Sequence, residues 1–164
     1  MKPGMAAALA LALLAAAAPL LARLSEDWLG LAPCALCLWQ RWPYWVAAVV
    51  ALAAAFVPGR ALRRGMVAAA VAVLASGAVA AFHLGVEAGW WPSPLPGCRA
   101  PTAAGTGASV DELLRGLTAA PAKPCDAPAY PVPGLPLSMA AMNLLYALGL
   151  GGIALIWAAR GARA

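Results

Sequence analysis

Charged side chains are scarce in this chain of 164 residues, where they make up 10% of the sequence against 64% for hydrophobic residues. Soluble domains typically carry about 25% charged residues, so the scarcity argues against a soluble protein. The mean hydropathy of +0.82 is typical of a membrane protein. The apolar runs also lack the roughly ten-residue alternating segments of membrane-spanning strands, so they predict helices.

Several apolar runs are long enough to cross a hydrocarbon core about 30 Å thick, which needs roughly 20 residues per helix. They cover residues 5–22, 37–57, 66–86 and 137–159. We therefore predict an all-α membrane protein, a single domain over 1–164 forming a four-helix transmembrane bundle, with outer loops at about 23–36 and 88–136. The first run exceeds the about 7 to 15 apolar residues of a signal peptide, so we expect it to be retained as a span.

Basic residues are concentrated in the short loop between the second and third spans and near the two chain ends. Arg60, Arg63 and Arg64 lie between the second and third spans, and Lys2 and Arg160 lie near the chain ends. Short loops rich in such residues stay in the cytoplasm, so we expect both termini there. All six acidic residues lie on the opposite side. The net charge of +5 is then explained by topology, without a nucleic-acid partner.

No cysteine lies in the parts of the sequence assigned to the cytoplasm. Cys34 and Cys37 form a C-x-x-C motif at the outer mouth of the second span, and Cys98 and Cys125 lie in the long outer loop. An even number of cysteines in an oxidising compartment indicates two disulfides. The C-x-x-C spacing favours a local pair, which leaves Cys98 with Cys125. We expect no metal site, because Cys98 and Cys125 do not form a second C-x-x-C motif.

The two cysteine pairs favour different roles. A bridge between Cys98 and Cys125 would stabilise the fold by about 3 kcal/mol in the chain-entropy model, so a structural role is credible there. The loop closed by Cys34 and Cys37 is too small to restrain an unfolded chain, so redox chemistry explains that pair better. The alternative is a non-enzymatic membrane scaffold with two structural disulfides.

The long outer loop holds ten of the fifteen prolines and a run of small residues, which cannot form a packed core. Within it, residues 109–112 match a capping box, and Val110, Leu113, Leu114 and Leu117 follow at helical spacing. This pattern predicts one short amphipathic helix, which either lies on the membrane surface or packs on the bundle.

A thiol at a lipid boundary needs help to ionise, because burial in apolar surroundings raises its pKa. Pro33 favours a helix start, which would place Cys34 and Cys37 near the positive end of the helix dipole. Arg41 follows Cys37 by one helical turn. Arg41 either extends to the lipid headgroups or holds the polar head of a membrane-soluble oxidant beside Cys37. A quinone fits, because it dissolves in lipid and accepts two electrons from a dithiol.

Other polar residues lie within the spans. His83 and Glu87 share one helix face at the outer end of the third span, and His83 is the only histidine. It is either a hydrogen-bonded packing residue or a proton-handling group beside the quinone. We expect Asn143 and Tyr146 to form hydrogen bonds between helices, and Pro43 to interrupt the second span. The glycines at 149, 151 and 152 are expected to permit close packing.

Three segments of the chain, taken with its topology, resemble the disulfide bond formation protein B (DsbB) family. They are CALCLWQRW at the head of the second span, GWWPSPLPGC entering the long loop and KPCDAPAY leaving it. Members of that family are quinone-linked oxidases of the bacterial inner membrane that re-oxidise a periplasmic thioredoxin-like dithiol oxidase of the DsbA type. The partner is a strong oxidant that ordinary thiol buffers cannot regenerate, and a quinone pool supplies the missing driving force.

The resemblance implies a role for each cysteine. Cys34 and Cys37 match the quinone-proximal pair, with Cys37 next to the quinone. Cys98 would form the mixed disulfide with the partner, and Cys125 would exchange with Cys34. Arg41 matches the quinone-side arginine. His83 and Glu87 lie near family positions around the quinone, which is ubiquinone or menaquinone.

Overall fold

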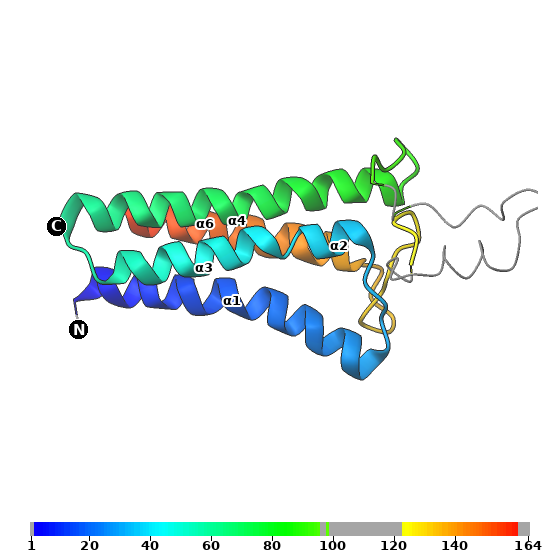
Figure 1. Cartoon of the computed structure of the whole chain (residues 1–164), viewed down its shortest axis with the longest axis horizontal. Helices are drawn as coiled ribbons and strands as arrows, with labels where there is room; N and C mark the ends of the chain where they lie inside the picture. Colours follow the sequence, from blue (N-terminus) through cyan, green and yellow to red (C-terminus); the bar gives the residue numbers. More distant parts are fainter. Residues whose placement is uncertain (1, 96–97, 99–122, 161–164) are drawn as a thin grey trace, which may run out of the picture.

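The computed structural model describes residues 2–95, 98 and 123–160, which form helices and no strands. The helices are α1 (Pro3–Leu29), α2 (Ala35–Trp39), α3 (Trp42–Ala55), α4 (Gly59–Glu87) and α6 (Met139–Arg160). They run side by side along one axis (Figure 1). Helices α1, α4 and α6 are each long and apolar enough to cross a membrane. The expected all-α membrane fold is confirmed at this level, and the capping-box segment at 109–112 lies outside the described residues.

The run expected to form one second span is divided into two helices. Helix α2 ends at Trp39 and α3 begins at Trp42, so the break falls just before Pro43. Proline lacks an N–H group and its ring clashes with the carbonyl four residues earlier, which explains the position of the break. The neighbouring helix α4 compensates, because Ser76 Oγ donates a hydrogen bond of 2.7 Å to the Gln40 carbonyl.

The helices extend beyond the apolar runs. Helix α1 continues to Leu29 through residues assigned to an outer loop, and ends at Gly30, whose φ of 64° is left-handed. Helix α4 already begins at Gly59 and includes the three arginines at 60, 63 and 64. Arginine is a good helix former, so a helix can continue past the end of an apolar run. Hydropathy therefore predicts the part of a helix that suits lipid, but not where the helix begins or ends.

Small residues form the contacts between helices. The main core cluster consists mostly of alanines from α1, α3, α4 and α6, which let the backbones approach closely. A Cβ added at Gly151 of α6 would lie 2.7 Å from the Leu74 side chain of α4. Gly149 and Gly152 face open space, so of the three glycines expected to permit close packing only Gly151 does so.

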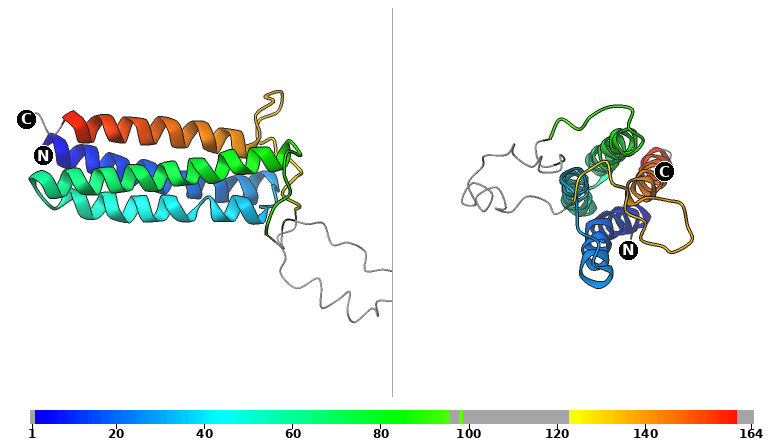
Figure 2. Two further views of the ribbon diagram at one scale, coloured as in Figure 1. Left: turned by 90° about the horizontal axis from the view of Figure 1, so that it is seen from above. Right: turned by 90° about the vertical axis from the view of Figure 1, so that its right-hand side faces the viewer.

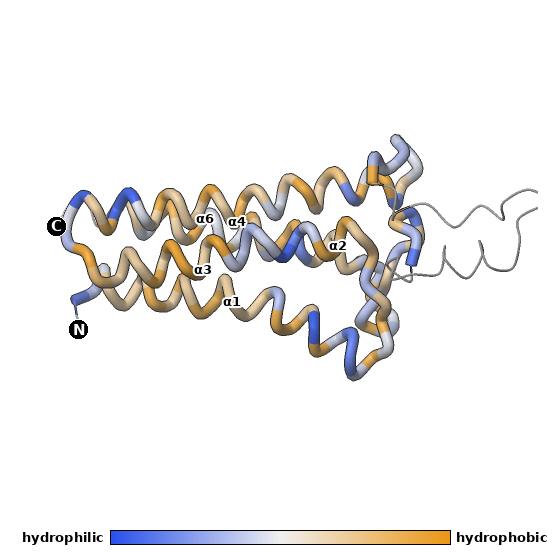
Figure 3. Tube along the Cα trace, in the orientation of Figure 1, coloured by the Kyte–Doolittle hydropathy of each residue, from blue (hydrophilic) through white to orange (hydrophobic). Residues whose placement is uncertain are grey.

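The two ends of the bundle differ. The start of α1, the α3–α4 turn and the end of α6 lie at one end, which we call the termini end (Figures 1 and 2). We call the other the cysteine end, because Cys34 caps the start of α2 there and packs in one cluster with Cys98 and Cys125. Toward the cysteine end, α1 diverges from the other helices (Figure 1). Apolar residues cover most of the helix length, and hydrophilic residues gather toward both ends (Figure 3).

Candidate functional site

The four cysteines meet at the cysteine end. Cys98 and Cys125 form a disulfide, as the sequence predicted. Cys34 and Cys37 are free thiols whose sulfur atoms lie 2.7 Å apart, so they are placed to form a disulfide with little movement. Cys34, Cys98 and Cys125 are buried in one hydrophobic cluster with Leu36. The fold therefore brings one closed and one open cysteine pair into contact.

Trp91 attaches the chain leading to Cys98 to helix α4. Its indole packs so closely on Gly85 that a Cβ there would have no room. The indole N–H donates a 3.1 Å hydrogen bond to the Phe82 carbonyl, and the two rings stack at 5.6 Å. Across the disulfide, the Cys125 N–H donates to the Cys98 carbonyl at 3.2 Å. The disulfide itself packs with Val86, near the end of α4.

The C-x-x-C motif forms the start of helix α2. Cys34 is the N-cap residue, and its sulfur accepts a 3.2 Å hydrogen bond from the Cys37 N–H. Cys34 precedes the helix and lies outside the predicted span. Hydrogen bonding to the Cys37 thiol, followed by the contacts with His83, outweighs burial and lowers the pKa of Cys34 well below its ordinary value. The Cys37 N–H donated to the Cys34 sulfur also favours a thiolate at this position.

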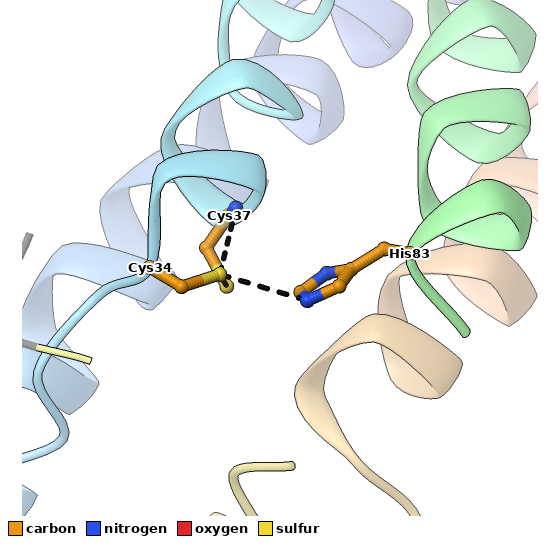
Figure 4. A group of neighbouring side chains, drawn as sticks. All are labelled: Cys34, Cys37 and His83. Carbon is orange, nitrogen blue, oxygen red and sulfur yellow. Dashed lines mark hydrogen bonds between the residues drawn. The ribbon is translucent and has the colours of Figure 1, made fainter. Parts of the chain in front are cut away.

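His83 lies between the two cysteine pairs and is only 2% exposed. Its Nε2 atom is 3.6 Å from the Cys34 sulfur and 3.1 Å from the Cys125 carbonyl oxygen. The ring extends from α4 toward the cysteines of the facing helix (Figure 4). On its other edge, Nδ1 is 2.9 Å from Gln40 Nε2. This places His83 in contact with Cys34 and Cys125.

Glu87 is also buried beside His83, one turn further along α4. Its Oε1 lies 3.9 Å from His83 Nε2, and its Oε2 accepts a 2.6 Å hydrogen bond from Ser138 Oγ. The carboxylate therefore connects α4 to the residue preceding α6.

Arg41 lies at the break between α2 and α3 and forms an ion pair with Glu26 of α1. Both side chains are largely buried. The Nε atom of Arg41 is buried and has no hydrogen-bond partner among the described residues. The sequence identifies Glu26 only as one of the acidic residues on the outer side, because nothing along the chain connects it to a residue on another helix.

A cavity of about 300 Å³ opens where α1 diverges from the bundle. Its polar end is formed by the C-x-x-C sulfurs and the residues around them: Cys34, Cys37, Gln40, Arg41, His83 and Glu87. Apolar residues of α1 and α6, such as Pro19, Leu21 and Met142, line the rest. One cavity is therefore lined by a dithiol and a cation as well as by apolar side chains.

Hydrogen bonds between residues that line this cavity connect the helices. Asn143 Nδ2 donates to Gln40 Oε1 at 2.7 Å, and Tyr44 donates to Asn143 Oδ1 at 2.8 Å. Tyr146 donates to the Leu14 carbonyl of α1 at 2.7 Å. The expectation that Asn143 and Tyr146 bond between helices is confirmed.

One group of residues has the geometry of a metal site. The ligand atoms of Cys34, Cys37 and His83 all lie within 4.8 Å of one another. Thiolates and imidazole are the ligands that zinc prefers, so the distances alone would permit an ion. Binding would also require a lone pair on the His83 nitrogen that faces the sulfur atoms.

Comparison with known proteins identifies the family. The profile of a family described as disulfide bond formation protein DsbB matches residues 5–157. Searches of curated proteins and of solved structures found no significant match. The matched segment includes all four cysteines, Arg41 and the apolar helices. The chain belongs to the DsbB family of membrane thiol oxidoreductases, which act in disulfide bond formation.

Proposed function

We propose that this protein is a thiol:quinone oxidoreductase of the bacterial inner membrane. It re-oxidises a periplasmic thioredoxin-like dithiol oxidase of the DsbA type and passes the electrons to quinone, which sustains disulfide bond formation. The observation that carries the proposal is one cavity whose polar end holds the C-x-x-C thiols, beside a second cysteine pair and next to a buried arginine. Family membership supports the chemistry.

The membrane placement follows from lengths and charges. Helix α3 has 14 residues, which cover roughly 21 Å and are too few to cross a bilayer alone. Together, α2 and α3 serve as the fourth span beside α1, α4 and α6. The arginines at 60, 63 and 64 lie at the termini end, which the positive-inside rule assigns to the cytoplasm. The cysteine end then faces the periplasm.

The cavity fits a quinone. Its volume of about 300 Å³ is within the range of small-molecule pockets, and its mostly apolar wall suits a lipid-soluble ring. Arg41 Nε is a buried donor that lacks an acceptor within the described residues, and a quinone carbonyl would supply one. Arg41, with His83 and Glu87 beside it, would hold the head group. A quinone bound there would supply a lipid-soluble acceptor for two electrons and two protons.

The cysteines transfer the electrons by thiol–disulfide exchange. A partner thiolate attacks Cys98, breaks its bond to Cys125 and forms a mixed disulfide, which the partner's second thiol then resolves. The partner leaves oxidised, and Cys98 and Cys125 hold its two electrons. Cys125 next attacks Cys34 in an oxidised Cys34–Cys37 pair, and Cys98 attacks Cys125 to restore the loop disulfide. The C-x-x-C pair is then reduced.

In the structure the Cys98–Cys125 disulfide is formed and the C-x-x-C thiols are free. This is the redox state that we propose for the end of these exchange steps. Burial of Cys34 and Cys125 in one cluster supports direct exchange between them. Cys37 leaves as a thiolate when Cys125 attacks Cys34, and Cys34 leaves in turn when Cys98 attacks Cys125. The low pKa of Cys34 makes it a good leaving group in that second step.

Quinone reduction tests the proposal. The purified protein in detergent, given quinone and a reduced thioredoxin-like oxidase, should cause partner-dependent loss of quinone absorbance. Each of the four single Cys→Ser variants should lose this turnover. Normal turnover by Cys37→Ser would overturn the proposal.

Partner trapping separates the enzyme from a scaffold with two structural disulfides. In Cys125→Ser, the unpaired Cys98 should attack the disulfide of the oxidised partner, releasing one partner thiol and forming a disulfide-linked adduct that is visible on a non-reducing gel. Cys98→Ser is the matched control and should give no such adduct. A scaffold would form none in either variant.

A further inference from the structure

A chain of buried hydrogen bonds begins on α4 and leads to the edge of the His83 ring. Ser76 Oγ lies 2.7 Å from the Gln40 carbonyl oxygen, which only accepts, so the single hydroxyl hydrogen must point there. Ser76 Oγ also lies 3.2 Å from Asn143 Nδ2. Because its hydrogen is already used, Ser76 accepts in that second bond. The atom of Asn143 that faces Ser76 must therefore be the amide nitrogen.

The orientation of Asn143 fixes the next side chain. Its amide nitrogen has two hydrogens, and the second points at Gln40 Oε1, 2.7 Å away. The Asn143 oxygen accepts from the Tyr44 hydroxyl at 2.8 Å, which is consistent with this orientation. Since Gln40 presents its oxygen to Asn143, it presents its nitrogen to His83. The amide orientations thus follow from Ser76, and not from an arbitrary choice between nitrogen and oxygen.

The nitrogen of Gln40 lies 2.9 Å from His83 Nδ1. An amide nitrogen only donates, so Nδ1 has to offer a lone pair and carries no hydrogen. We propose that Ser76, Asn143 and Gln40 hold His83 in the tautomer with its hydrogen on Nε2, which makes the ring a fixed hydrogen-bond donor to the two cysteine pairs. Gln40, Asn143 and Ser76 are then positioning residues for the cysteine chemistry.

The Nε2 hydrogen faces the groups that change during disulfide exchange. The Cys125 carbonyl oxygen is 3.1 Å away and the Cys34 sulfur 3.6 Å away. A neutral ring with a hydrogen on Nε2 can donate a hydrogen bond to a thiolate on Cys34 and so stabilise it. No proton has to move between the Cys34 thiol and the ring for this bond to form. Glu87 Oε1 lies 3.9 Å from the same nitrogen, which is beyond hydrogen-bond distance. The ring therefore has a donor edge toward the cysteines and an acceptor edge toward Gln40.

The same tautomer excludes His83 from binding a metal. A histidine that binds through Nε2 needs a lone pair there, and its other nitrogen usually donates to a carboxylate or carbonyl group. Here Gln40 presents a donor to Nδ1, which is the opposite arrangement. The Cys34, Cys37 and His83 group has short distances but the wrong protonation for a zinc site.

Nitrogen NMR on the intact protein tests the tautomer directly. His83 is the only histidine, so protein labelled with ¹⁵N-histidine gives the signals of one ring. At pH 7 in detergent, we expect Nδ1 to show the shift of an unprotonated nitrogen and Nε2 that of a protonated one. The result should be the same with and without reductant, because the contacts that fix the ring lie on the Gln40 side. A hydrogen on Nδ1, in either the other tautomer or a doubly protonated ring, would overturn the proposal.

A nearly isosteric variant tests the cause. Gln40→Glu replaces the donor beside Nδ1 with an acceptor, so a hydrogen should appear on Nδ1. Tyr44→Phe is the control, because it removes a contact of Asn143 while leaving Ser76 in place, and the ring should keep the wild-type shifts. If Gln40→Glu also kept them, Gln40 would not set the tautomer. None of these NMR readouts depends on quinone turnover. The tautomer can therefore be wrong while the proposed function is right, and the proposed function can be wrong while the tautomer is right.

Discussion

The two ends of the helix bundle are held together by different kinds of contact. Toward the termini end, alanines fill the space between helices, and glycines such as Gly65 and Gly151 meet side chains with no room to spare. At the cysteine end, α1 diverges, a cavity opens, and buried hydrogen bonds replace apolar contacts. Close packing at one end fixes the helices, which allows the other end to hold a cavity and buried polar groups. Substitutions at the two ends should therefore affect different properties.

The largest effect is expected at Arg41. Arg41→Ala removes the buried donor at the cavity, and hydrogen bonds to charged groups are worth about 1.5 to 3 kcal/mol. We expect the KM for quinone to rise by about 10- to 100-fold in steady-state assays. The change also leaves Glu26 buried without its ion-pair partner, which lowers stability.

Glu26 supplies the control for this prediction. Glu26→Gln breaks the ion pair but keeps Arg41, so the KM for quinone should change much less than in Arg41→Ala. In the double variant, Arg41→Ala with Glu26→Gln, stability should recover while the high KM remains. A wild-type KM in Arg41→Ala would show that Arg41 serves only as a partner of Glu26.

A smaller effect, on stability alone, is expected at the packed end. In Gly151→Val the new side chain meets Leu74, and overpacking of this kind costs about 1 to 3 kcal/mol. Gly149→Val is the matched control, since Gly149 faces open space on the same helix. Thermal unfolding in detergent should show a clear drop for the first variant relative to the second. Turnover of the protein that remains folded should be unchanged in both.

The sequence revealed the residues whose chemistry is distinctive. The cysteine pairs, Arg41 and His83 were found because few other side chains can supply a thiol, a buried cation or an imidazole. The helix break was expected from Pro43, and it falls just before that residue. These features depend on residue type and local backbone chemistry, both of which can be read along the chain.

The partners of these residues could not be predicted. Glu26 lies 15 positions from Arg41, and Ser76 lies on a different helix from Gln40. Each pair depends on the rotation and register of two packed helices, which nearly uniform runs of alanine and leucine do not specify. Gln40 was noted only as part of a motif, although its amide connects His83 to the network.

A further effect, smaller again, is expected where the outer loop attaches to α4. Trp91→Ala removes a hydrogen bond to the Phe82 carbonyl and the packing on Gly85. If the contacts that hold the outer loop on α4 lose about 1 kcal/mol, the exchange between the partner and the Cys98–Cys125 pair should become roughly fivefold slower. Stopped-flow measurement of partner oxidation would show it. Trp28→Ala is the control, because Trp28 is mostly exposed at the end of α1 and its loss should leave the rate nearly unchanged.

The smallest effect is expected at Tyr146, which joins α6 to α1 beside the cavity. Its hydroxyl donates to the Leu14 carbonyl, and Tyr146→Phe removes that bond while keeping the ring. Because the side chain is partly exposed, water replaces some of the loss, and we expect about 0.5 kcal/mol of destabilisation. Tyr130→Phe, in the exposed outer loop, should change thermal stability less. If Tyr146→Phe instead destabilised the protein as much as Gly151→Val, hydrogen bonds at the cysteine end would hold the helices as firmly as alanine packing does, and the division between the two ends would be wrong.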